Sequence, residues 1–169
     1  WQQAYDYCQD LNKNSGYAGY KSWRLPTIKE LQTIIHYGKS RPAVDTNYFN
    51  GYSGDAYLWS GTADVKDSSK MWEISDSSGS SKTQAKTSNN AHVRCVYGTE
   101  LTETTSFGSS INGVIKDSNT KLYWQDSDVN KTWEQALKYC EDLEYGGYSD
   151  WRLPNINELS SLVNHSKST

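Results

Sequence analysis

The chain has 169 residues and a net charge of -3, and only 35% of its residues are hydrophobic. Aromatic residues make up 13%, with 7 Trp and 13 Tyr, which favours a folded protein with a small, ring-filled core over a disordered chain. The negative net charge argues against a protein that binds nucleic acid over its whole surface. No apolar run is long enough to cross a bilayer.

The first predicted elements are two short helices. In residues 1–11, WQQAYDYCQDL, positions i, i+3, i+4, i+7 and i+10 form one helical face, which carries Trp1, Ala4, Tyr5, Cys8 and Leu11. Pro26 then favours an extended backbone at Leu25, because the residue before a proline avoids the helical region. Thr27 and Glu30 have the spacing of a capping box and predict the start of the second helix.

A loop and a group of strands are predicted next. The loop covers residues 39–56 and is rich in Gly, Asn, Asp and Tyr. The strand-like runs are 57–62, 70–75, 81–87 and 91–97. We expect a solvated set of turns for the acidic residues Asp64, Asp67 and Asp76.

The rest of the chain is predicted to contain a hairpin and two more helices. Residues 99–112 are polar and rich in Thr and Ser, which is typical of a linker. Residues 113–117 and 121–126 then predict a hairpin. Thr132 with Gln135, and Asn155 with Glu158, have the spacing of capping boxes that begin helices.

The sequence contains an internal repeat. The run WQQAYDYCQDL at 1–11 returns as WEQALKYCEDL at 133–143, and GYKSWRLPTIKEL at 19–31 returns as GYSDWRLPNINEL at 147–159. The same order and nearly the same offset, 132 and then 128 residues, indicate a duplicated domain. We expect both copies to be incomplete, the first without a hairpin like 113–126 and the second without its later half.

These motifs resemble those of the Lcl C-terminal domain family, named for a bacterial collagen-like adhesin. The resemblance rests on the helix with W-x-x-A-x-x-Y-C-x-x-L, the G-Y-x-x-W-R-L-P segment, Leu58-Trp59-Ser60 and Val93-Arg94-Cys95-Val96. It implies an α+β, C-type-lectin-like fold, with two helices packed on a small antiparallel sheet, in duplicate. The implied organisation is a first domain at 1–98, a linker at 99–112 and the first half of a second domain at 113–169.

The resemblance also implies a role for the cysteines. The helix cysteine Cys8 is expected to pair with Cys95 of the last strand, which would indicate an oxidising compartment. Cys140 is then left unpaired by truncation of the second copy. The alternative is three reduced core cysteines, because cysteine is often buried.

Two Arg and two Glu residues recur in the repeat. Arg24 with Glu30, and Arg152 with Glu158, could bind anions, but their repetition together favours structural ion pairs that order the turn. The tryptophans at motif or strand positions are predicted to lie in the core: Trp23, Trp59, Trp72 and Trp151.

Two groups of side chains are candidates for ligand binding. The first would be a basic patch for sulfated glycans, and a solvated strand face is its alternative: Lys66, Lys70, Lys82 and Lys86. The second lies in or beside the Gly-rich loop and could stack on sugars: Tyr48, Tyr52 and Tyr57.

Catalytic and metal chemistry find little support in the sequence. The calcium-binding triplets of C-type lectins, CxxC motifs, and HxH or HxxxH pairs are all absent, so no metal or cofactor is expected. No nucleophile motif indicates an enzyme.

The sequence therefore predicts an extracellular or cell-surface bacterial module for adhesion or glycan binding. The alternative is a structural repeat of a fibre or surface layer, in which neighbouring copies complete one another by strand addition. A hypervariable ligand-binding domain is a third reading.

Overall fold

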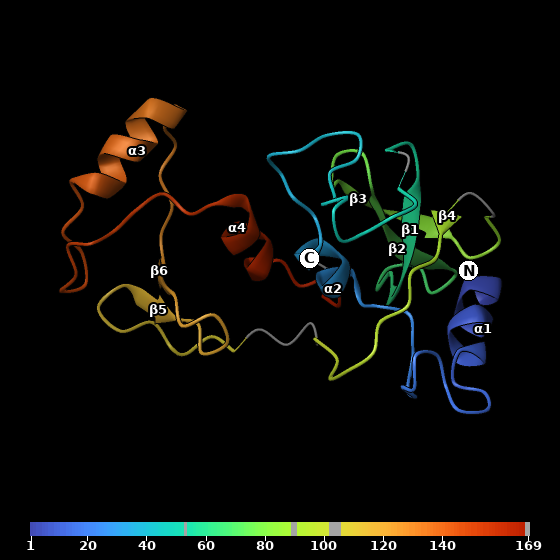
Figure 1. The fold of residues 1–169 in the computed structure, drawn as a ribbon. Coiled ribbons are helices and arrows are strands. Elements are labelled where there is room, and N and C mark those ends of the chain that lie inside the picture. Colours follow the sequence, from blue (N-terminus) through green and yellow to red (C-terminus); the bar gives the residue numbers. More distant parts are fainter. Residues whose placement is uncertain (53, 89–90, 102–105, 168–169) are drawn as a thin grey trace. The chain divides into compact units, whose positions relative to one another are not determined.

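The computed structural model describes residues 1–52, 54–88, 91–101 and 106–167. Within these residues the chain is a mixed α+β protein with four helices and two sheets, as predicted (Figure 1). It divides into two compact units, which are described separately. Unit 1 comprises Trp1–Glu103 with Asn164–Thr169, and unit 2 comprises Thr104–Val163. No helix in the described parts is long and apolar enough to cross a membrane.

Unit 1 is built on a four-stranded sheet in the order β3-β2-β1-β4. Its strands are β1 (Tyr57–Ala63), β2 (Lys70–Ser75), β3 (Ser81–Ala85) and β4 (Ala91–His92). The first three strands are antiparallel neighbours, but β4 runs parallel to β1. The sheet is therefore mixed, and the prediction of an antiparallel sheet is wrong for β4. The strand predicted at 91–97 ends at His92, and beyond it Val96 exchanges two backbone hydrogen bonds with Arg24.

The two helices of unit 1, α1 (Gln2–Asp10) and α2 (Ile28–Thr33), pack on opposite faces of this sheet. Successive strand residues point to opposite faces, so adjacent Leu58 and Trp59 belong to different clusters. The α2 side contains Ile28, Leu31, Ile35, Ala43, Val44, Leu58 and Ile74. The α1 side contains Ala4, Cys8, Leu25, Trp59 and Met71.

A disulfide joins Cys8 of α1 to Cys95, the pairing that the family resemblance implied. The two Cα atoms are 5.5 Å apart, and the bridge spans 87 residues of sequence. It fixes the segment after β4 to the α1 side of the core. Cys140 is a free cysteine.

Unit 2 contains the predicted hairpin and two helices. The hairpin pairs β5 (Val114–Lys116) with β6 (Tyr123–Gln125), and its turn is held by Asp117, whose carboxylate accepts bonds from Asn119 N–H and the Thr120 hydroxyl. The helices are α3 (Trp133–Glu141) and α4 (Ile156–Leu162). Both begin with the predicted capping boxes, as does α2.

The predicted linker is partly bound to the two units. Leu101 donates its N–H to Glu30 at 2.9 Å and accepts the Thr27 hydroxyl at 3.0 Å, so this end is attached to α2. Phe107 and Ile111 form isolated bridges to the hairpin, with Asp117 and Val114 respectively. Residues 102–105 of the linker lie outside the described residues.

Candidate functional site

A tight turn between α1 and α2 fixes the indole ring of Trp23. The indole Nε1–H of Trp23 donates to the carbonyl oxygens of Tyr17 at 3.3 Å and Tyr20 at 3.0 Å. The turn requires glycine at position 16, where φ is +81° and an added Cβ would lie 2.0 Å from the Tyr20 oxygen. The backbone of Trp23 is held in turn by two hydrogen bonds with the Asn12 side chain.

Four aromatic rings gather around this turn and form what we call the aromatic cluster of unit 1: Tyr17, Tyr20, Trp23 and Tyr97. Tyr97 lies 4.9 Å from Tyr20 and 6.0 Å from Trp23, measured between ring centroids. All three tyrosines are exposed, and Trp23 is only partly buried, so its prediction as a core residue is wrong. The hydrogen bonds of the indole explain this position, because they tie Trp23 to the surface turn instead of the sheet.

Unit 2 carries an equivalent cluster, which contains Tyr145, Tyr148, Trp151 and Tyr123. The indole Nε1–H of Trp151 again donates to two tyrosine carbonyls, each at 3.2 Å. Tyr123 lies 5.2 Å from Tyr148 and comes from the hairpin instead of from the segment that supplies Tyr97 in unit 1. Trp151 is partly buried, which again contradicts its prediction as a core residue.

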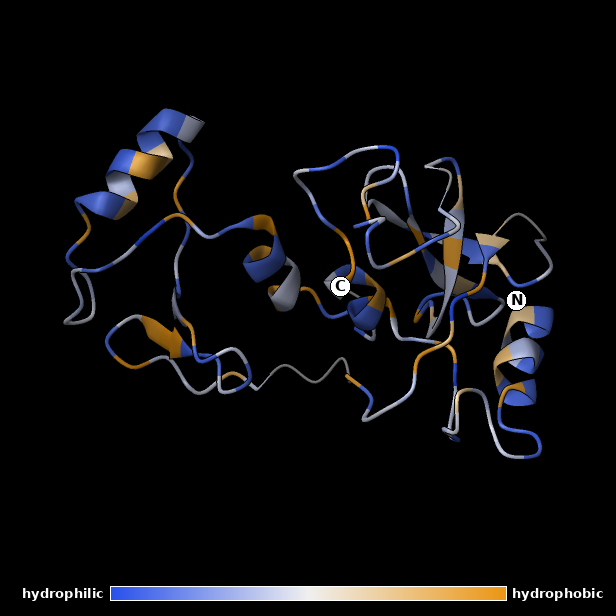
Figure 2. Ribbon diagram, viewed as in Figure 1, coloured by the Kyte–Doolittle hydropathy of each residue, from blue (hydrophilic) through white to orange (hydrophobic). Residues whose placement is uncertain are grey.

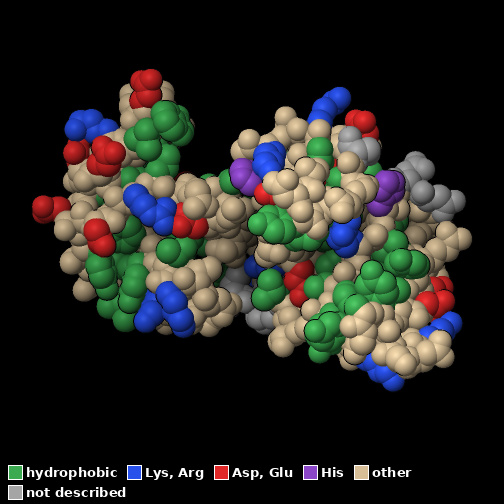
Figure 3. All heavy atoms as spheres, in the orientation of Figure 1, with side chains coloured by type: hydrophobic (Ala, Val, Ile, Leu, Met, Phe, Trp, Pro, Cys, Tyr) green, Lys and Arg blue, Asp and Glu red, His purple; other side chains and the backbone are tan. Residues whose placement is uncertain are grey.

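The clusters were missed in the sequence, although a signal for them is present. The spacing Y-x-G-Y-x-x-W occurs at 17–23 and again at 145–151. The space-filling view shows hydrophobic side chains, a class that includes tyrosine and tryptophan, at the surface of both units (Figure 3). Exposed aromatic groups held in fixed positions are typical of binding surfaces, since little side-chain entropy is lost when a ligand covers them.

The four predicted lysines do not form an unopposed basic patch. Lys70 pairs with Asp67 at 3.2 Å, and Lys82 pairs with the buried Glu73 at 3.3 Å. Burial raises the pKa of Glu73, although Lys82 acts in the opposite direction. The ammonium of Lys86 lies 5.3 Å from the ring of Trp1, and exposed Lys66 belongs to the loop between β1 and β2.

The three predicted tyrosines have different environments. Tyr48 is 80% exposed, whereas Tyr52 is partly buried beneath the guanidinium of Arg94, which lies 4.7 Å from its ring centroid. Burial raises the pKa of the Tyr52 hydroxyl. Tyr57 lies below the ammonium of Lys82 at 3.8 Å. Cations thus cover two of the three rings that were predicted to stack on sugars.

Both predicted ion pairs are present, in the structural arrangement that the sequence favoured. Arg24 makes two 2.7 Å bonds to the Glu30 carboxylate, which also accepts the N–H groups of Thr27 and Leu101. Burial acts to raise the pKa of Glu30, but these hydrogen bonds outweigh it, so its pKa is lowered. Arg152 forms the same two-pronged pair with Glu158 in unit 2.

The acidic turn residues differ from the prediction at one position. Asp76 is fully buried, not solvated, because its carboxylate accepts the N–H groups of Gly54 at 3.2 Å and Ala56 at 2.8 Å. Asp76 thereby anchors the end of the Gly-rich loop. Among the described residues, no group of three or more His, Cys, Asp or Glu side chains is placed to hold a metal ion.

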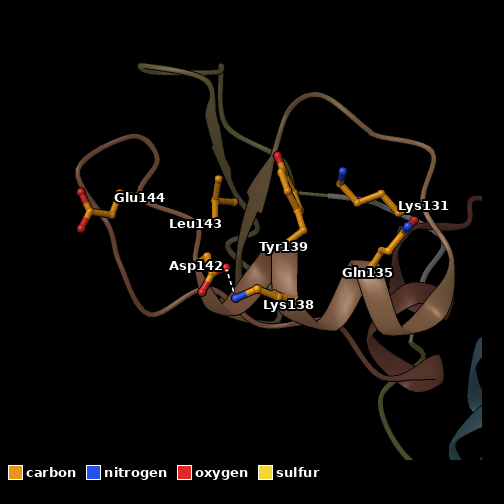
Figure 4. Close-up of a pocket in the computed structure, with 7 residues that line it drawn as sticks. All are labelled: Lys131, Gln135, Lys138, Tyr139, Asp142, Leu143 and Glu144. Carbon is orange, nitrogen blue, oxygen red and sulfur yellow. Dashed lines mark hydrogen bonds and ion pairs between the residues drawn. The ribbon is translucent and has the colours of Figure 1, made fainter.

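A hollow of about 720 Å³ lies beside α3 in unit 2 (Figure 4). Three of its four charged groups already have partners, because Lys138 pairs with Asp142 at 2.7 Å and the Lys131 ammonium lies 5.1 Å from the Tyr139 ring. The close-up shows the Glu144 carboxylate lying apart from the other side chains. The hollow therefore offers no convergent set of polar groups, and the aromatic clusters are the better candidate site.

Comparison with known proteins adds one finding. The family model described as the Lcl C-terminal domain matches residues 1–97 and 113–169. No curated protein and no solved structure matches the chain.

Proposed function

The chain belongs to the Lcl C-terminal domain family, and from that premise we propose that it is an extracellular, surface-associated module that binds glycans. The proposed binding groups are the exposed aromatic clusters of the two units. We further propose that unit 1 has a C-type-lectin-like fold and that the protein has no catalytic activity. The duplicated aromatic cluster is the observation that carries the proposal.

The chemistry of the clusters suits neutral sugars. Aromatic faces pack against the apolar C–H faces of pyranose rings, while the tyrosine hydroxyls can donate and accept hydrogen bonds at the edge. The Cys8–Cys95 disulfide supports an extracellular location, since such bridges persist in oxidising compartments.

Adhesion to sulfated glycans through lysines is the competing proposal, and the structure supports it less well. Two of the four lysines are paired with carboxylates, which lowers the local positive charge. The two proposals differ in their response to salt. Electrostatic binding weakens as ionic strength rises, whereas stacking on rings does not.

The test is a glycan array on the native, non-reduced protein at low and high salt, followed by titration of the best ligand. We expect neutral glycans to bind equally at both salt concentrations. Tyr20→Ala and Tyr97→Ala should each weaken binding to unit 1 by about two- to tenfold, the range of aromatic pair energies. Tyr148→Ala should do the same in unit 2.

Tyr48→Ala is the matched control, because Tyr48 is exposed but lies outside both clusters. Loss of affinity in Tyr48→Ala but not in the cluster variants would contradict the proposed site. Binding confined to sulfated glycans and abolished by salt would favour the lysines instead. An array with no bound glycan would refute glycan binding altogether.

A further inference from the structure

The two aromatic clusters are built on the same seven-residue turn, but the charges on that turn differ. In unit 1 the turn reads GYAGYKS at 16–22, and in unit 2 it reads EYGGYSD at 144–150. Lys21 gives the first turn one positive charge, whereas Glu144 and Asp150 give the second turn two negative charges. Both turns are mostly white and blue in Figure 2, the colours of polar and charged residues. Both tyrosines recur in the repeat, so the two sites differ mainly in charge.

The three charged side chains of the turns are available to a ligand. Lys21, Glu144 and Asp150 are all exposed, and none of them forms an ion pair with another described residue. The stem of Lys21 lies against its own turn, because a Cβ added to Gly16 would come within 3.0 Å of Lys21 Cγ. Asp150 directly precedes Trp151, which contacts two tyrosine rings of its cluster. Each charge therefore acts on whatever binds beside the rings, to an extent that salt reduces.

The other charges near the clusters offset one another. Three cations close to the turns in sequence already face carboxylates: Arg24 faces Glu30 and Glu100, Lys13 faces Asp10, and Arg152 faces Glu158. Two opposite charges lie beside the rings of unit 2. The Lys116 ammonium is 5.6 Å from the Tyr123 ring, and the Asp126 carboxylate accepts a hydrogen bond from the Tyr145 hydroxyl at 3.2 Å. The turns thus determine the sign of the charge at each cluster.

We infer that the two clusters select sugars of opposite charge, an acidic sugar with a carboxylate in unit 1 and an amino sugar in unit 2. This inference rests on the proposed glycan binding and adds its selectivity. Lys21 attracts a carboxylate carried by a sugar that stacks on the rings of unit 1. In unit 2, Glu144 and Asp150 repel a carboxylate and attract an ammonium group, which the faces of tyrosine and tryptophan also favour.

The experiment titrates the full, isotope-labelled chain with two matched pairs of trisaccharides and follows it by NMR. One pair is trigalacturonic acid and its methyl ester, and the other is triglucosamine and its N-acetylated form. The members of each pair differ in charge but hardly in ring shape. The indole Nε1–H signals of Trp23 and Trp151 report the two clusters separately, because each group donates to carbonyls of its own turn. Trp23→Phe and Trp151→Phe identify the two signals.

We expect the Trp23 signal to report about two- to fivefold tighter binding of the acid than of its ester, which corresponds to one exposed charge pair. The Trp151 signal should report the opposite order, and a similar preference for triglucosamine over its acetylated form. Both preferences should fade as salt is raised. The neutral ester measures glycan binding itself, so an ester that binds as well as the acid at both signals would refute the selectivity alone. Absence of binding by all four sugars would also overturn the inference, whereas the glycan array still tests the proposed function.

Three variants assign the selectivity to the turns. Lys21→Ser and Asp150→Ser give each turn the serine that the other unit has at the same position. Lys21→Ser should abolish the preference for the acid at Trp23 and leave the Trp151 signal unchanged, and Asp150→Ser should reduce the preferences at Trp151 only. Lys66→Ser removes the same charge from an exposed loop outside the cluster and should change neither signal. A preference for the acid that survives Lys21→Ser, or that falls as much in Lys66→Ser, would overturn the inference.

Discussion

Replacing Glu30 with glutamine removes the charge from a buried ion pair while keeping the side chain's shape. Glu30 is 8% exposed, and its two oxygens accept four hydrogen bonds, two from Arg24 and one each from the N–H groups of Thr27 and Leu101. The amide of glutamine has only one oxygen. Its NH₂ group would therefore face two donors whichever way it turned.

The expected loss of unfolding free energy is about 3 kcal/mol, near the lower end for removing one partner of a buried pair because Arg24 retains some contact with water. The repeat supplies a matched control. Glu158 makes the same pair with Arg152, which is 59% exposed, so Glu158→Gln should cost only about 0.2–1 kcal/mol. Water can solvate the Arg152 guanidinium when the charge opposite it is removed.

The measurement is urea unfolding monitored by peptide-resolved hydrogen exchange, which reports the stability of each unit separately. Glu30→Gln should lower protection of α2 and of the sheet in unit 1, while Glu158→Gln should leave unit 1 unchanged. Equal losses in the two variants would refute the reasoning, since burial is the difference on which the larger figure depends.

Three further predictions follow from the structure. Replacing Cys8 and Cys95 by alanine should lower the unfolding free energy of unit 1 by about 4.5 kcal/mol in urea titrations, because the bridge closes a long loop, and a loss below about 1 kcal/mol would contradict this. Unit 2 should lose stability as pH falls below about 4.5, because the hydrogen bond from Arg152 lowers the folded-state pKa of Glu158. The loss should stay within the same range of about 0.2–1 kcal/mol, since water screens the exposed Arg152, and urea titrations across this range should show a flatter dependence in Glu158→Gln. Gly113→Ala should destabilise the hairpin more than Gly147→Ala destabilises its turn. Both glycines have φ above +80°, but only at Gly113 would an added Cβ meet another atom, the Tyr145 hydroxyl at 2.0 Å. Equal shifts of the two variants in thermal melts would argue against this contact.

Local patterns in the sequence determined much of the secondary structure. The capping boxes at Thr27, Thr132 and Asn155 marked the starts of three helices, because each depends on residues only three positions apart. The first three strands of the sheet were also predicted nearly to their ends. The repeat itself, visible as two copies of W-R-L-P, predicted that the Arg–Glu pairs would form twice.

Burial and long-range pairing were decided only by the tertiary structure. Trp23 was predicted to lie in the core, yet its indole N–H bonds to two carbonyls of a surface turn and joins Tyr97, which is distant in sequence. The last predicted strand ended early because Val96 found a backbone partner in Arg24, 72 positions earlier in the chain. Ile28 and Ile156 occupy equivalent positions in the repeat, yet Ile28 is buried and Ile156 is 47% exposed, because β1 and β2 cover Ile28. A short motif determines its own backbone and side-chain chemistry, but whether water or a sheet covers it depends on segments far away in the sequence.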